Sequence, residues 1–193
     1  QAGGVCKDTT LSLANISGKL ITEDKEGVEG ATVSVKGMDK PGVPDFKSTQ
    51  DGSYSFTSVP MPGSDHISIK AIRDDNPMNG VSTLDLVLIQ KHILGTEALK
   101  SPYKMIAADV DNNNDITVLD LLELRKLILG IYDKLPNNTS WKFIPHSYKF
   151  PDPNSPWGYP IEDALTDMTA TMIRDQIGVK IGDVNGTAAP HSL

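Results

Sequence analysis

The chain contains a duplicated helical segment, and this repeat limits the fold more than any other feature of the sequence. Residues 81–95 (VSTLDLVLIQKHILG) align without gaps to residues 116–130 (ITVLDLLELRKLILG). In both copies apolar residues recur every three or four positions, as on one face of an α-helix. Each copy ends in glycine, the residue that best adopts the left-handed conformation after a helix. The repeat predicts two amphipathic helices that pack antiparallel, with contacts among Leu84, Leu88, Leu119 and Leu122.

Residues 14–72 have a different pattern, in which polar and apolar side chains alternate over short runs. The runs at 15–22 (NISGKLIT), 31–37 (ATVSVKG) and 66–72 (HISIKAI) each place apolar residues on one face of an extended chain. Strands of this kind bury their apolar faces by packing as two layers. We therefore expect an α+β protein in which an all-β sandwich precedes the helix pair.

Two segments of this region also support a resemblance to a known family. Residues 17–37 (SGKLITEDKEGVEGATVSVKG) are followed by residues 48–60 (STQDGSYSFTSVP), where Asp51-Gly52 suits a tight hairpin. Together they resemble the carboxypeptidase regulatory-like domain, a small transthyretin-type sandwich. The resemblance covers about the first third of the chain, and it implies a spacer or stability module without catalytic activity.

An acidic loop leads into the second helix. Numbered from Asp109, its places 1, 3, 5, 7, 9 and 12 carry Asp109, Asp111, Asn113, Asp115, Thr117 and Asp120. This is EF-hand spacing, in which side-chain oxygens and the carbonyl at place 7 surround a hard cation. Calcium suits such a loop because it accepts six to eight oxygen ligands with tolerant geometry. The alternative is a metal-free turn in which Asp115 or Thr117 caps the helix.

With this loop, residues 74–130 resemble a type I dockerin module, in which two calcium loops are each followed by one helix. An aspartate at place 12, here Asp120, agrees with that resemblance. Place 6 is Asn114 where glycine is usual, and asparagine tolerates positive φ. The resemblance implies calcium binding and a protein partner, a cohesin or another extracellular module.

The first copy of the loop is less complete. Its ligand places carry Asp74, Asn76, Met78, Gly80, Ser82 and Asp85. Met78 offers no side-chain oxygen, so Asp74, Asn76, the Gly80 carbonyl and Asp85 would hold a calcium with water filling the gap. A metal-free turn held by side-chain hydrogen bonds is the alternative. Residues 183–186 (DVNG) echo a calcium-loop opening, but no further acids follow, and a plain turn is preferred there.

Charge and composition exclude several classes of function. The net charge of −7 argues against nucleic acid or an anionic membrane as partner. No apolar run approaches the roughly 20 residues that cross a bilayer. The four histidines are scattered, and no nucleophile with a base and no phosphate-binding loop is evident, so no catalytic residue is assigned. The single cysteine, Cys6, is either half of an interrupted disulfide or a spare thiol.

These observations predict a linker over 1–13, a sandwich over 14–72, a dockerin-like module over 73–131 and a C-terminal extension over 132–193 whose strands pack back. The expected function is non-catalytic attachment of an exported, cell-surface or secreted multidomain bacterial protein to a protein partner. The alternatives are a calcium-rigidified subunit of an adhesin or filament and the accessory end of a secreted glycoside hydrolase. By the dockerin resemblance, the contact residues are Thr83, Gln90, Lys91, Val118, Arg125 and Lys126.

Overall fold

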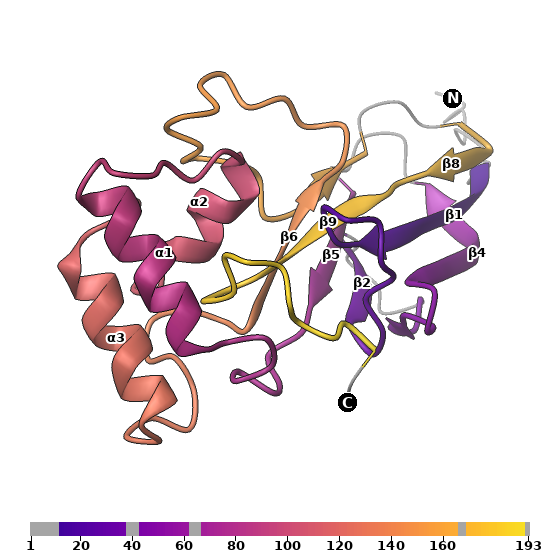
Figure 1. Ribbon diagram of the computed structural model, residues 1–193. Helices are drawn as coiled ribbons and strands as arrows, with labels where there is room; N and C mark the ends of the chain where they lie inside the picture. Colours follow the sequence, from indigo (N-terminus) through magenta and orange to yellow (C-terminus); the bar gives the residue numbers. More distant parts are fainter. Residues whose placement is uncertain (1–11, 38–42, 62–66, 166–168, 192–193) are drawn as a thin grey trace, which may run out of the picture.

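The computed structural model describes residues 12–37, 43–61, 67–165 and 169–191. Its helices gather at one end of the molecule and its strands at the other (Figure 1). The helices are α1 (Thr83–Ile93), α2 (Pro102–Ala108) and α3 (Val118–Ile128). Cys6 and most of the predicted 1–13 linker lie outside the described residues. No described helix has both the length and the apolar character needed to cross a membrane.

The strands form two sheets. One has the order β4-β1-β9-β6, with β8 pairing in parallel with β1; the other has the order β3-β2-β5-β7. The bounds in the first sheet are β1 (Ser12–Ile21), β4 (Ser53–Met61), β6 (Trp141–Pro145), β8 (Thr171–Ile173) and β9 (Gln176–Lys180). Those in the second are β2 (Thr32–Lys36), β3 (Phe46–Lys47), β5 (Ser68–Ile72) and β7 (Asp163–Ala164). The predicted α+β class is confirmed.

The C-terminal strands are integral to both sheets. Strand β9 lies between β1, its parallel neighbour, and β6, its antiparallel neighbour. Strand β7 extends the other sheet by pairing with β5. The residues predicted as an extension, 132–193, therefore complete the sheets that residues 14–72 begin.

Two apolar cores lie on opposite faces of the β6–β9 pair, because successive side chains of a strand point to opposite sides. Trp141 and Phe143 of β6 belong to the core to which buried side chains of both sheets contribute. Ile144 of β6, with Ile177 and Val179 of β9, belongs to the second core, which the helices cover. The helices are thus held on the sheet that the C-terminal strands complete.

The helix pair packs through a different face from the predicted one. Helices α1 and α3 lie against each other and run in opposite directions, as expected (Figure 1). However, Leu84 and Leu119 are both 53% exposed and Leu122 is 46% exposed, so the prediction that these leucines form the buried face of the pair is wrong, and of the four only Leu88 packs against the core. The buried apolar side chains of the two helices are Ile89, Leu124 and Leu127, which belong to the core that the helices share with β6 and β9. The sheet determines which side of each helix is buried.

Candidate metal centre

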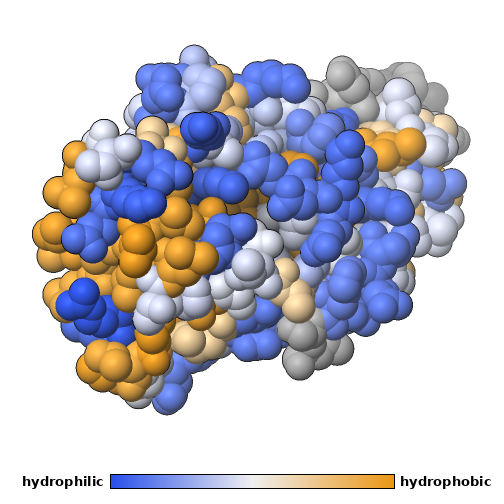
Figure 2. Space-filling model, viewed as in Figure 1, coloured by the Kyte–Doolittle hydropathy of each residue, from blue (hydrophilic) through white to orange (hydrophobic). Residues whose placement is uncertain are grey.

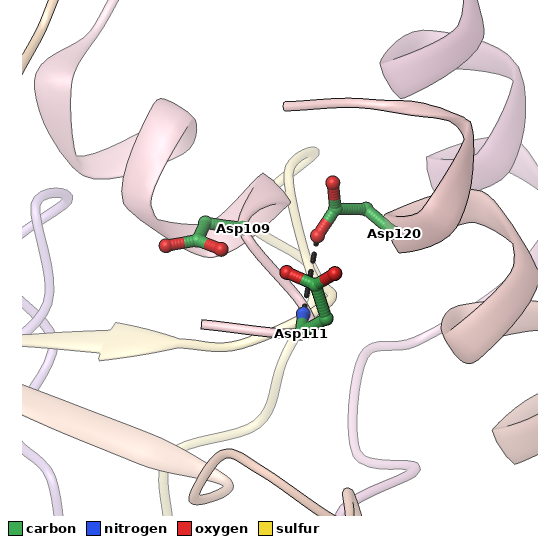
Figure 3. Close-up of side chains that lie close together, drawn as sticks. All are labelled: Asp109, Asp111 and Asp120. Atoms are coloured by element: carbon green, nitrogen blue, oxygen red, sulfur yellow. Dashed lines mark hydrogen bonds between the residues drawn. The ribbon is translucent and has the colours of Figure 1, made fainter. Parts of the chain in front are cut away.

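Three carboxylates of the second loop converge on one point. Asp109 ends α2, Asp111 lies in the loop, and Asp120 is in the first turn of α3 (Figure 3). One oxygen from each lies within 4.8 Å of the others. Asp109 and Asp120 are 2% and 0% exposed. Three clustered carboxylates, two of them buried, are an arrangement that a hard divalent cation stabilises.

Asp120 joins the two ends of this loop through hydrogen bonds. Its Oδ1 accepts from the backbone N–H groups of Val110 (2.7 Å) and Asp111 (3.1 Å), and the second of these is drawn in Figure 3. Its Oδ2 accepts from the N–H of Thr117 at 2.8 Å, and the Thr117 hydroxyl accepts from Leu119 N–H, which completes a capping box. The residue at place 12 therefore organises the loop and caps the helix at once.

The turn at the middle of the loop is left-handed. Asn114 has φ +67°, so the expectation that asparagine replaces the usual glycine at place 6 is confirmed. Asp109 accepts hydrogen bonds from the N–H groups of Asn113 (2.9 Å) and Asn114 (3.1 Å). Asn113 Oδ1 in turn accepts from Asp115 N–H at 2.8 Å. These bonds wrap the backbone around the Asp109 carboxylate.

Burial sets the electrostatics of the cluster. It raises the pKa of the Asp109 and Asp120 carboxyls above the ordinary value, while hydrogen bonds from backbone N–H groups act in the opposite direction. A nearby carboxylate, Asp111, raises the pKa of both further. A bound cation would relieve this repulsion, so the charged cluster and the cation favour each other.

Residues of the C-terminal region support the loop from outside, which the sequence analysis did not predict. Asn138 donates hydrogen bonds to the carbonyls of Asp109 (2.9 Å) and Val110 (3.2 Å). The Lys142 ammonium contacts Asn112 Oδ1. A lone asparagine or lysine distant in sequence carries no readable pattern.

The first loop is assembled differently from the second. Asp74 Oδ1 accepts a hydrogen bond from Ser140 N–H at 2.9 Å, and Asn76 is exposed with φ +42°. The Gly80 carbonyl accepts from the Thr187 hydroxyl at 3.0 Å. Asp85 is fully buried, and its Oδ2 accepts a hydrogen bond from the N–H of Ser82, the N-cap of α1. Its Oδ1 accepts hydrogen bonds from the N–H groups of Val184 (3.0 Å) and Asn185 (3.2 Å). The structure thus unites Asp85 with residues 183–187 near the end of the chain.

Most of the predicted contact residues are on the helix surfaces. Thr83, Gln90, Lys91 and Arg125 are exposed, and Val118 is 65% exposed. Lys126 is half-buried, paired with Glu123 at 2.7 Å and near the Tyr132 hydroxyl at 3.2 Å, so its charge is already compensated.

Exposed apolar side chains gather over the same helices, where Figure 2 shows an extensive hydrophobic surface. They are Leu84, Val87, Leu94, Val118, Leu119, Leu122, Leu129 and Ile131. Apolar surface concentrated in this way is typical of an interaction site.

Comparison with curated proteins and with solved structures gave no match to the chain. A family model does match one part of it. Dockerin domains are non-catalytic modules that bind calcium and attach to cohesin modules, and they occur in secreted, cell-surface-attached cellulosome proteins. The matched segment includes all three helices and the acidic cluster: residues 74–129 match the Dockerin type I domain.

Proposed function

We propose that the chain is a calcium-dependent attachment module of an exported protein, with its helix pair as the contact surface. The observation that carries the proposal is the Dockerin match over residues 74–129, which covers both loop–helix units. Asp109, Asp111, Asn113 and Asp120 would supply side-chain oxygens, Asp115 its carbonyl, and Thr117 a water-mediated contact at place 9. The remaining strands would hold the helices in position.

Calcium is expected to stabilise the whole chain. At a concentration 100 times its dissociation constant, an ion that binds one folded-state site adds about 2.7 kcal/mol to the free energy of unfolding. For a chain of this size that corresponds to a rise of about 5–10 °C in melting temperature. Thermal melts followed by circular dichroism, with calcium or with a chelator, measure the difference. Equal concentrations of magnesium provide the control, because its demand for octahedral geometry suits the loop poorly. A melting temperature indifferent to calcium would contradict the proposal.

The contact surface is tested best at the two repeat-related leucines. Leu84 and Leu119 stand at place 11 of their loops and are equally exposed, so neither is needed for the core. The helices run in opposite directions, and a partner would meet equivalent surfaces in two orientations related by rotation. Leu84→Glu or Leu119→Glu alone should weaken binding about two-fold, since one orientation remains. The double variant should abolish it.

Biolayer interferometry against immobilised type I cohesin modules, with and without calcium, provides the measurement. Ile173→Glu is the matched control, because Ile173 is 73% exposed on β8, away from the helices (Figure 1). Calcium-dependent binding that survives the double variant would place the contact elsewhere. Absence of binding to every cohesin would mean that this chain has a different partner.

A further inference from the structure

The end of the chain reproduces, beside α1, the hydrogen-bond pattern that the second loop makes beside α3. Asp120 Oδ1 accepts from Val110 N–H and Asp111 N–H; Asp85 Oδ1 accepts from Val184 N–H and Asn185 N–H. Helices α1 and α3 also share a capping box, with Ser82 and Thr117 as equivalent N-caps. Residues 183–185 therefore occupy the same position relative to α1 as residues 109–111 occupy relative to α3.

The correspondence continues through the turn that follows. Asp109 accepts from the N–H groups four and five residues later, at 2.9 and 3.1 Å. Asp183 accepts from the N–H groups of Thr187 (3.1 Å) and Ala188 (2.7 Å), also four and five residues later. In the second loop the next residue along the chain is Asp115, at place 7. Beside Asp183, the corresponding position in space is taken by Gly80, from a distant part of the chain. A Cβ on Gly80 would lie 2.7 Å from Asp183 Oδ2, which places the Gly80 backbone against this carboxylate.

Backbone N–H groups donate hydrogen bonds to both carboxylates of this arrangement, which are nevertheless without a salt bridge in the described residues. Asp85 and Asp183 are 0% and 7% exposed. Lys180 is close enough to act on both through space, yet it donates to the carbonyls of Pro77 (2.7 Å) and Ile181 (3.2 Å). Buried charges are ordinarily paired or bound to a metal ion, so a cation would stabilise these two carboxylates.

One polar atom lacks the partner that a buried position requires. Asn185 Oδ1 is buried and accepts no hydrogen bond from any described residue. The N–H of the same residue donates to Asp85, and Asp183 lies two residues earlier, so the Asn185 backbone is next to both carboxylates. Its counterpart in the second loop, Asp111, directs an oxygen into the acidic cluster. An oxygen atom that receives no hydrogen bond is available to coordinate a cation.

We propose that calcium binds α1 in a split loop, whose first half is residues 183–188 and whose second half is residues 80–85. The inference rests on the proposed calcium function, and it assigns ligands that differ from Asp74 and Asn76. Places 1, 3, 5, 7, 9 and 12 are taken by Asp183, Asn185, Thr187, the Gly80 carbonyl, Ser82 and Asp85. With two carboxylates where the second loop has three, this site binds calcium about 10-fold more weakly than the second loop.

The test is calcium titration of the chelator-stripped full chain by isothermal calorimetry. The wild-type chain should bind two ions. Asn185→Ala should eliminate or weaken the weaker site by about 10-fold or more while leaving the stronger one unchanged. Because Asn185 Oδ1 has no hydrogen bond to lose, this variant should still fold, and circular dichroism verifies that it does. Asp74→Asn, at the first place of the contiguous alternative, should leave both sites intact.

A gain of affinity tests the same geometry in the opposite direction. Asn185→Asp gives the split loop the third carboxylate that the second loop has, and should tighten the weaker site about 10-fold. Loss of a site in Asp74→Asn, with Asn185→Ala unaffected, would overturn the split loop in favour of a contiguous one. A single ion that disappears in Asp120→Ala and persists in Asn185→Ala would also overturn it, while the calcium function of the second loop would stand. Absence of any calcium binding would refute both.

Discussion

A chain that ends at residue 131 is expected not to fold, although it retains every residue of the Dockerin match. The truncation removes β6, β8 and β9, and so leaves β1 with an open edge. It also removes Ile144, Ile177 and Val179, which form the surface that the helices cover. Asp85 loses the two N–H groups that meet its Oδ1. The loss of two hydrogen bonds to Asp85 and the exposure of the core together exceed the stability of an ordinary domain.

Circular dichroism and thermal melts of residues 1–131 provide the measurement. We expect no cooperative transition, with or without calcium, whereas the full chain should give one. Adding residues 132–193 as a separate peptide serves as the control, because it returns the missing strands, and cooperative melting should reappear. A sigmoidal, calcium-dependent melt of residues 1–131 alone would show that the helix pair needs no sheet beneath it.

Asp120→Ala is expected to reduce calcium affinity at the second loop by about 100-fold or more, because it removes a buried carboxylate at the place where EF-type loops close. It also leaves the N–H groups of Val110, Asp111 and Thr117 without their acceptor. The stability of the calcium-free chain should fall as well, by about 1–3 kcal/mol for each buried donor that finds no water.

Asp115→Ala is the matched control within the same loop. Asp115 is exposed, and the ligand expected from it is its backbone carbonyl, which alanine retains. Calcium titration and urea unfolding of the two variants should therefore separate clearly, with Asp115→Ala close to the wild-type chain. Equal losses in both variants would mean that overall negative charge, and not ligand geometry, governs binding.

The second loop could be predicted from the sequence because all of its parts are contiguous. Alternating oxygen-bearing residues from Asp109 onward, a residue that tolerates positive φ at Asn114, and an aspartate in the first turn of a helix are local features. The strands of residues 14–72 and the two helices were predictable for the same reason, since hydrophobic period is a local property. In each case the structure has the element where the period placed it.

Non-local pairing accounts for what the sequence did not reveal. The calcium-loop opening at residues 183–186 was visible, but no further acid follows Asp183, and nothing local joins this turn to α1, about 100 residues earlier. The buried face of the helices was misassigned because leucines surround both α1 and α3. Only the position of β6 and β9 beneath them determines that Leu124 is buried and Leu119 is exposed.

The pairing of β1 with β9 also determines when this protein folds. Leu20 pairs with Gln176 and Ile21 with Ile177. The pairing of β1 is therefore incomplete until β9 is present. Contacts so distant in sequence require the chain to close a large loop before they contribute, and this slows folding. During synthesis, β1 and β4 would emerge as an antiparallel pair whose β1 edge lacks its neighbours until β8 and β9 have been translated. The first sheet therefore cannot be completed until the last strands have been translated, although the pairs β1–β4 and β2–β5 need no later residue.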